Sequence, residues 1–145
     1  MKKIKSLKMK LAVAGLTCLM ASSIGMSSAS AAGNYKDTPF KFYYNGDGSD
    51  RFTDMREKRD YTSSYVHNYG SNYGYSVIVY GSKNYSSSGI GTYATAGPIP
   101  HVGVGEAKYL PNYVKERGYN YAQLGLMSDS HSASVMAGEW SPDSI

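Results

Sequence analysis

The sequence predicts an all-β fold: a small antiparallel β-sandwich of about seven or eight strands with one short helix, preceded by a signal peptide. Three observations support it. The apolar segments are short, Gly- and Ser-rich turns separate them, and only one segment has residues typical of both helix ends. Regularly spaced short strands of this kind are typical of sandwiches and barrels.

The first 31 residues have the three parts of a secretory signal peptide. Five lysines precede an apolar stretch from Leu11 to Met26, and small residues end the segment at Ala29-Ser30-Ala31. The apolar stretch is shorter than the roughly 20 residues that a membrane-spanning helix needs. We therefore expect cleavage after Ala31, a secreted, extracellular product, and no stable membrane insertion after cleavage.

Residues 32–145 are predicted to form a single secreted β domain. The one cysteine, Cys18, lies in the signal segment, so a disulfide or a Cys-ligated metal is not expected. Five of the fifteen Lys and Arg also lie there, which leaves ten against eleven Asp and Glu. This balance gives no basic excess for binding phosphates, so nucleic acid is not an expected partner. Aliphatic residues are scarce, and we expect the fifteen tyrosines and Trp140 to supply the missing core, with Tyr packed at the edges of a thin hydrophobic layer.

The first strands are predicted from alternation and turn residues. A strand over residues 39–44 ends at Asn45-Gly46, a dipeptide typical of tight hairpins. A second strand is expected over residues 51–59, with residues 62–69 as its partner. Acidic and basic residues interleave along 47–60, which we interpret as a solvated face or a protected sheet edge.

The strongest strand signal is residues 75–80, YSVIVY, which is apolar on both faces and is therefore expected to be central. A polar loop is predicted over residues 82–91. Short strands should follow at 92–95 and 101–105, separated by the Pro-containing segment 97–100.

The one helix is predicted over residues 110–118. Pro111 fits its first turn, Gly118 fits the position past its end, and Leu110, Tyr113 and Val114 would face the sheet. Strands over residues 119–127 and 132–140 complete the domain. In the former, the inward side chains are expected to be Ala122, Leu124 and Leu126.

No catalytic or metal-binding pattern is evident, and we expect neither a cofactor nor enzyme activity. Residues 45–50 carry alternating oxygen ligands but lack the Gly and Glu of a calcium-binding EF-hand loop, and we favour a simple hairpin turn, which explains the same residues. The three histidines, His67, His101 and His131, are too far apart for a metal motif. A hydrolase would need a recognisable elbow or a facing carboxylate pair, and neither is evident.

Tyrosine is the compositional anomaly. Seven tyrosines fall within 25 residues, at positions 61, 65, 69, 73, 75, 80 and 85. Alternation places Tyr65, His67 and Tyr69 on one face of a strand, opposite Ser64, Val66 and Asn68. Tyrosine combines a rigid apolar ring with a polar tip, which suits recognition. The candidate binding residues are therefore Tyr65, His67, Tyr69 and Tyr73. The alternative is that these rings form the core and its rim.

Four segments resemble a family of short exported proteins of unknown function from Gram-positive, spore-forming-type bacteria. They are residues 37–40 (DTPF), 111–119 (PNYVKERGY), 121–124 (YAQL) and 138–144 (GEWSPDS), the last being the most distinctive. The resemblance implies secretion and a compact domain. It supplies no catalytic residues.

Three functions from different classes fit these observations. The first is a non-catalytic binding or interaction module at or outside the cell envelope, with cell-wall glycan or another extracellular protein as its partner. The second is a bacteriocin-like antagonist of neighbouring bacteria, although no basic amphipathic segment supports membrane attack. The third is a hydrolase with an unrecognised site.

Overall fold

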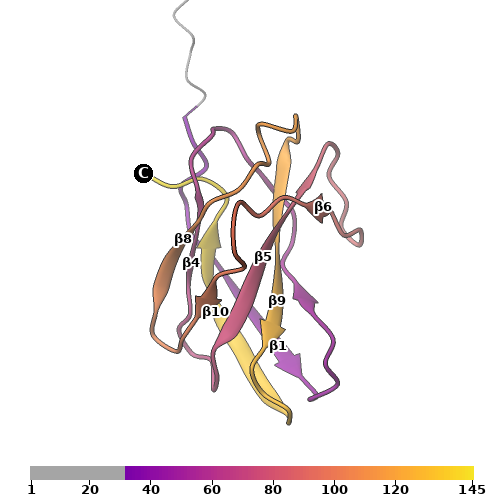
Figure 1. The fold of residues 1–145 in the computed structure, drawn as a ribbon, viewed down its shortest axis with the longest axis vertical. Coiled ribbons are helices and arrows are strands. Elements are labelled where there is room, and N and C mark those ends of the chain that lie inside the picture. Colours follow the sequence, from indigo (N-terminus) through magenta and orange to yellow (C-terminus); the bar gives the residue numbers. More distant parts are fainter. Residues whose placement is uncertain (1–31) are drawn as a thin grey trace, which may run out of the picture.

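Two antiparallel sheets face each other in the computed structural model, which describes residues 32–145 (Figure 1). The predicted signal peptide, its cleavage site and Cys18 lie outside the described residues. One sheet has the order β1(Thr38–Tyr44), β10(Ser134–Ser141), β4(Ser64–His67), β8(Ala107–Leu110). The other has the order β2(Arg51–Phe52), β9(Tyr121–Ser128), β5(Tyr75–Ser82), β6(Thr92–Tyr93), with β3(Arg56–Glu57) on β9 and β7(His101–Val102) on β5. The predicted all-β, antiparallel two-sheet class is confirmed.

The chain crosses repeatedly between the two sheets. β1 pairs with β10, whereas β2 and β3 pair with β9, so residues 45–50 connect one sheet to the other. The predicted hairpin at Asn45-Gly46 is therefore wrong. A turn does form, since Gly46 and Gly48 have positive φ angles and the Gly48 N–H donates to the Tyr44 hydroxyl at 2.7 Å. Positive φ allows the reversal but does not choose the strand that receives the chain.

The predicted strand 51–59 is interrupted. β2 and β3 flank residues 53–55, where Thr53 takes over the pairing: its N–H donates to the Leu124 carbonyl at 3.0 Å, and its hydroxyl accepts the Leu124 N–H at 3.0 Å. This split helps raise the number of strands to ten in the described part of the chain, instead of seven or eight. The expected pairing of 51–59 with 62–69 is also wrong, because β4 pairs with β10 and β8.

The predicted helix over residues 110–118 does not form, and residues 32–145 contain no α-helix. Leu110 instead ends β8. Asn112 bridges to Thr95, and its side-chain oxygen accepts the Val114 N–H at 3.3 Å, which starts a single turn. Leu110 and Val114 are fully buried as expected, but Tyr113 is 45% exposed. The Pro and Gly signals therefore mark the ends of a turn that is too short for a helix.

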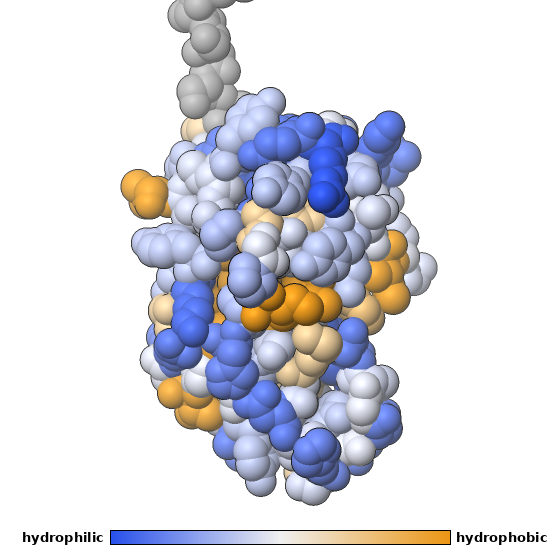
Figure 2. All heavy atoms as spheres, in the orientation of Figure 1, coloured by the Kyte–Doolittle hydropathy of each residue, from blue (hydrophilic) through white to orange (hydrophobic). Residues whose placement is uncertain are grey.

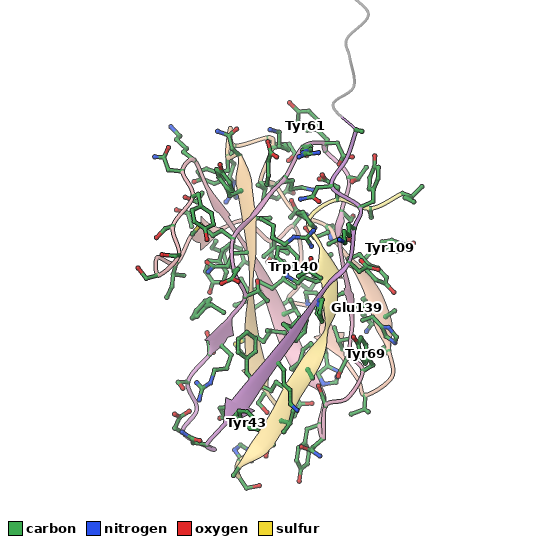
Figure 3. The ribbon with its side chains drawn as sticks, turned by 180° about the vertical axis from the view of Figure 1, so that it is seen from behind. Tyr43, Tyr61, Tyr69, Tyr109, Glu139 and Trp140 are labelled. Carbon is green, nitrogen blue, oxygen red and sulfur yellow. The ribbon has the colours of Figure 1, made fainter. Side chains whose placement is uncertain are left out.

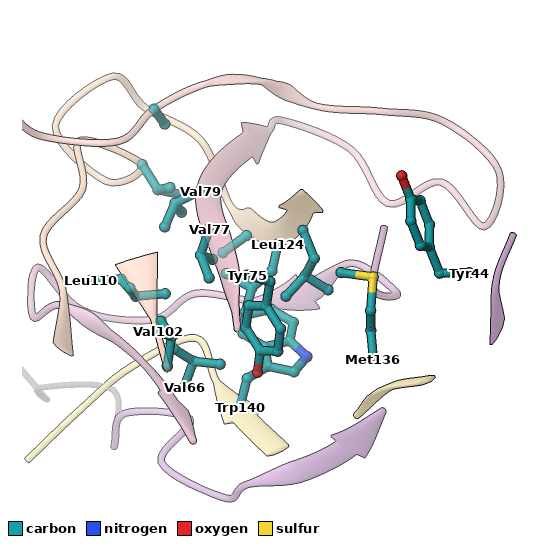
Figure 4. Close-up of a cluster of buried hydrophobic side chains, with 14 residues drawn as sticks. Tyr44, Val66, Tyr75, Val77, Val79, Val102, Leu110, Leu124, Met136 and Trp140 are labelled. Atoms are coloured by element: carbon teal, nitrogen blue, oxygen red, sulfur yellow. The ribbon is translucent and has the colours of Figure 1, made fainter. Parts of the chain in front are cut away.

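The core lies between the sheets and follows the predicted alternation (Figure 4). β5 is central, between β9 and the β6 and β7 strands, and its Val77 and Val79 are fully buried. Ala122, Leu124 and Leu126 of β9 face inward as expected. The expectation that tyrosines replace missing aliphatic residues in the core is wrong, although Tyr119 packs against the edge of the core. Only two of the fifteen tyrosines are buried, Tyr44 and Tyr75, and the rest of the core is mainly Val, Leu, Met and Trp.

A buried ion pair closes one end of the sandwich. Lys58 Nζ lies 3.0 Å from Asp143 Oδ1, and these side chains are 1% and 0% exposed. The ammonium also donates to the carbonyls of Thr62 at 2.6 Å and Pro142 at 2.7 Å, so all three of its protons are bonded. Burial lowers the pKa of Lys58, and the Asp143 carboxylate opposes this shift. The interpretation of residues 47–60 as solvated is thus wrong for Lys58.

Asp143 also holds the N-terminal segment. Its Oδ2 accepts the backbone N–H of Asn34 at 2.6 Å and that of Arg59 at 3.0 Å. The Ser64 hydroxyl at the start of β4 donates to the Pro142 carbonyl at 2.8 Å. The first described residues and the C-terminal residues therefore meet at the same end of the molecule (Figure 1).

Arg56 joins the two sheets next to this ion pair. Its guanidinium lies 5.3 Å from the centre of the Trp140 ring and donates to the carbonyls of Trp140 and Lys36, each at 2.7 Å. Burial lowers the pKa of Arg56. The side chain thus connects β3 in one sheet with β10 in the other, and with the segment that leads into β1.

Gly138 of β10 occupies a position with no room for a side chain. A Cβ there would lie 2.3 Å from the His67 carbonyl oxygen and 2.9 Å from the Phe40 ring. The backbone oxygen belongs to the neighbouring strand β4 and cannot rotate away. The glycine therefore sets how closely the two strands approach.

Replacing Asp143 with Ala should destabilise the fold by about 3–5 kcal/mol, because it leaves the Lys58 charge buried without its partner. Urea unfolding followed by Trp140 fluorescence measures this change. The matched control is Glu57→Ala, which breaks the exposed Glu57–Arg59 pair and should cost less than about 1 kcal/mol. Equal losses from the two variants would contradict a structural role for the buried pair.

Replacing Gly138 with Ala should cost roughly 1–3 kcal/mol, since the methyl group would push β10 away from β4. Gly103→Ala is the control, because a Cβ at Gly103 would meet only the flexible Glu106 carboxylate, at 3.5 Å. Thermal unfolding monitored by circular dichroism compares them. An unchanged midpoint for Gly138→Ala would show that β10 can move at this point without loss.

Candidate functional site

The outer surface of the β1-β10-β4-β8 sheet carries a group of aromatic side chains, which we call the tyrosine face. Its members are Tyr43 of β1, Tyr65 and His67 of β4, Tyr69 just after β4, and Tyr109 of β8. Figure 3 views the molecule from this side: Tyr109, Glu139 and Tyr69 follow one another along one side of the sheet, and Tyr43 lies near the end of β1.

Strand register places these side chains on one surface. Tyr65 is opposite Tyr109, and His67 is opposite Glu139. Side chains alternate along a strand, so when Val66 and its neighbour Trp140 enter the core, the residues on either side of them point outward. The predicted alternation over residues 64–69 is confirmed: positions 64, 66 and 68 are buried, whereas 65, 67 and 69 are not.

The aromatic side chains on this surface form two pairs. The rings of Tyr65 and Tyr109 are 5.7 Å apart between centroids and inclined at 54°, and those of His67 and Tyr69 are 5.3 Å apart. His67 Nδ1 lies 3.4 Å from Glu139 Oε1. Tyr109 is 61% exposed and Tyr69 is 43% exposed, so large parts of both rings are open to solvent. Neighbouring rings limit one another's rotation and hold the surface in shape.

Three of the four predicted binding residues, Tyr65, His67 and Tyr69, are thus brought together. Tyr73 is 46% exposed in the loop before β5, and among residues 32–145 it has no ring contact with the other three. Ser71 and Asn72 fasten this loop to β10. The Ser71 hydroxyl bonds to both the N–H and the carbonyl of Ala137, and the Asn72 backbone and side chain bond to Val135.

A hollow of about 240 Å³ opens at the end of the tyrosine face beside the buried ion pair; we call it the terminal hollow. Its lining includes Tyr35, Asp37, Tyr65, Tyr109 and Ile145. The Tyr35 hydroxyl donates to Asp60 Oδ2 at 3.0 Å, which fixes that ring. Burial, followed by the charges of Asp37 and Glu139, raises the pKa of Tyr65. The hollow therefore combines aromatic walls with the carboxylate of Asp37.

Two other hollows differ in character. One of about 420 Å³ is lined by polar and charged residues that include Glu57, Arg59 and Lys115. The other, of about 230 Å³, lies between the edges formed by β1 and β2 and includes Phe42 and Phe52. On the opposite side of the molecule, hydrophobic residues form small separate groups among hydrophilic ones (Figure 2). The terminal hollow is the one that adjoins the tyrosine face.

Two kinds of side-chain grouping that support catalysis are a His–carboxylate–hydroxyl triad and a metal-ligand cluster. His101 Nε2 lies 2.6 Å from Asp129 Oδ2, but within residues 32–145 no hydroxyl group bonds to His101 as a triad would require. No group of three His, Cys, Asp or Glu in this part of the chain is placed to hold a metal ion. At the turn 45–50, bonds from Ser49 are the main cause that lowers the pKa of Asp47, so this carboxylate has its partners inside the turn.

Tyr43, Tyr109, Asp37 and Glu139 were not predicted as site residues. Alternation along 39–44 could have indicated Tyr43. Tyr109 was missed because residues 107–110 were not predicted as a strand. Glu139 could be placed opposite His67 only after the pairing of β10 with β4 was known.

Comparison with known proteins gives a match to a protein family whose function is not known. A model of the family described as "Protein of unknown function (DUF2712)" matches residues 27–144. No curated protein and no solved structure matches the chain. Among the described residues, no helix is long and apolar enough to cross a membrane.

Proposed function

Because the chain belongs to the DUF2712 family of unknown function, we propose a function from its own residues: a secreted, non-catalytic binding module of a Gram-positive bacterium. Residues 1–31 direct export and are removed. Residues 32–145 then act at or outside the cell envelope, where the tyrosine face binds the polysaccharide of the wall.

The observation that carries this proposal is the paired, exposed arrangement of rings on one sheet surface. Tyr65 lies beside Tyr109, and His67 beside Tyr69; in each pair the second ring is exposed and the first is partly buried. Tyrosine gives a large contact area with only two side-chain rotations to restrict, and its hydroxyl remains available for hydrogen bonds. The neighbouring rings reduce further the freedom that binding would remove.

The chemistry of the face favours a sugar polymer over a protein partner. Stable protein interfaces have an apolar centre that is poor in charge. Here the rings are interleaved with His67, Glu139 and Lys41, and the Lys41 ammonium lies 5.6 Å from the centre of the Tyr43 ring. Sugar rings offer apolar C–H faces for the phenol rings, and hydroxyl groups for the imidazole, carboxylate and ammonium.

A sedimentation assay with purified Gram-positive cell-wall sacculi, wall polymers attached, tests the proposal. The wild-type protein should pellet with the sacculi in a saturable manner. The double variant Tyr69→Ala/Tyr109→Ala should bind at least about tenfold more weakly, because truncating interface aromatic residues costs roughly 1–2 kcal/mol or more.

The control is Tyr85→Ala/Tyr113→Ala, which removes two tyrosines of similar exposure, 57% and 45%, that lie beside the other sheet. It should bind like the wild type, and both double variants should keep the wild-type circular dichroism spectrum. Failure of the wild-type protein to pellet, or equal losses in both variants, would reject the tyrosine face as a polysaccharide-binding surface. Capture of a secreted protein that depends on Tyr69 and Tyr109 would instead favour a protein partner.

A further inference from the structure

The terminal hollow differs from the rest of the tyrosine face in shape and charge. The face is an open sheet surface, whereas the hollow is a concavity of about 240 Å³. This volume is below the roughly 300–1,000 Å³ of pockets that enclose whole small molecules. The hollow is therefore suited to one chemical group at the end of a larger ligand.

Three tyrosines contribute to the lining of the hollow. Tyr65 and Tyr109 are inclined at 54° to each other, so two ring surfaces meet at an angle. Tyr35 adds a third ring from the N-terminal segment, and its hydrogen bond to Asp60 holds it in place. Ring faces carry partial negative charge, and rings arranged around a small space attract cations.

Of the two Asp carboxylates in this lining, only that of Asp143 has an ion-pair partner among residues 32–145. Among residues 32–145, no side chain forms an ion pair with Asp37. Asp143, which also borders the hollow, is neutralised by Lys58. The Arg56 guanidinium donates to the Trp140 and Lys36 carbonyls, keeps its positive charge and attracts Asp37 without forming an ion pair with it. Asp37 therefore places beside the rings a negative charge that no ion pair among residues 32–145 holds.

We propose that the terminal hollow binds an alkylammonium group, held by the rings of Tyr35, Tyr65 and Tyr109 and by the carboxylate of Asp37. This inference rests on the proposed function in one respect, because it names the chemical group that the tyrosine face would recognise on its ligand. The group can be an aminoacyl ester of a wall polymer or a lysine side chain of a wall peptide, which present the same cation.

Titrations with small probes, followed by NMR of the tyrosine ring signals, test the cation site directly. Choline and n-butylamine should shift the signals of Tyr65 and Tyr109 in a saturable manner. The uncharged analogues 3,3-dimethylbutan-1-ol and n-butanol should not, since they have similar shapes without the charge. Equal shifts from charged and uncharged probes, or no saturable shift, would overturn the proposal.

Variants separate the contributions of charge and ring. Asp37→Asn should weaken choline binding at least about threefold, whereas Asp54→Asn, at another exposed carboxylate, should leave it unchanged. Tyr109→Phe keeps the ring face and should retain binding, and Tyr109→Ala should lose most of it. Unchanged binding in Asp37→Asn would show that the carboxylate does not contribute and would reject the site as described.

Sacculi separate the two sources of the cation and distinguish this inference from the proposed function. Mild alkaline treatment removes ester-linked amino acids from the sacculi. Reduced pelleting after this treatment would identify the aminoacyl ester as the source of the cation. Unchanged pelleting, together with competition by N-acetyl-lysine amide, would identify the lysine side chain.

If the wild-type protein does not bind sacculi but binds choline with the expected variant pattern, the proposed function fails and the cation site stands. If binding to sacculi needs Tyr69 and Tyr109 but choline causes the same shifts as its uncharged analogue, the proposed function stands and the cation site is rejected.

Discussion

The contact between Lys58 and Asp143 is the constraint on which the rest of the structure depends. It joins residues 85 positions apart in the sequence and removes both charges from water. A buried charge without a partner costs several kcal/mol, so the fold must bring these two side chains together or lose much of its stability. The carbonyl groups of Thr62 and Pro142 complete the shell around the ammonium.

The same contact organises the end of the sandwich where the terminal hollow lies. Asp143 holds the backbone of Asn34, and through it the segment that carries Tyr35 and Asp37. The Pro142 carbonyl accepts the Ser64 hydroxyl at the start of β4, the strand that carries Tyr65. The hollow and the edge of the tyrosine face are therefore built from segments that the buried pair holds in place. Pro142 and Asp143, within the ending W-S-P-D-S, make these contacts.

Few of the tyrosines lie in the core, and most lie at the surface. A thin core between two sheets can be filled by Val, Leu, Met and one Trp, and it needs only Tyr44 and Tyr75 in addition. Among residues 32–145, the buried Tyr75 hydroxyl has no hydrogen-bond partner, and burial raises the pKa of that group. A buried hydroxyl group without a hydrogen-bond partner lowers the stability of the fold, whereas an aliphatic side chain has no such group. The other tyrosines are wholly or partly exposed: Tyr119 packs against the edge of the core, whereas Tyr69 and Tyr109 present large parts of their rings to solvent.

Local patterns in the sequence determined the class of the fold and the direction of many side chains. Alternation places Leu124 and Leu126 inward, and Tyr65 and His67 outward, because successive side chains on any strand point to opposite faces. Turns at Gly46 and Gly118 follow from the need for positive φ. Side-chain direction and turn formation depend on neighbours a few residues away. The local alternation therefore also predicted three of the residues that form the tyrosine face.

Pairing between distant segments was decided only by the tertiary structure. Which sheet receives residues 51–57, whether Lys58 is exposed or buried, and which side chains complete the site all depend on partners tens of residues away. Asp37, Tyr109 and Glu139 joined the site through strand pairing and the position of the N-terminal segment. The physical reason is that backbone pairing is chemically the same for every strand, so the choice of partner depends on the packing of the whole chain.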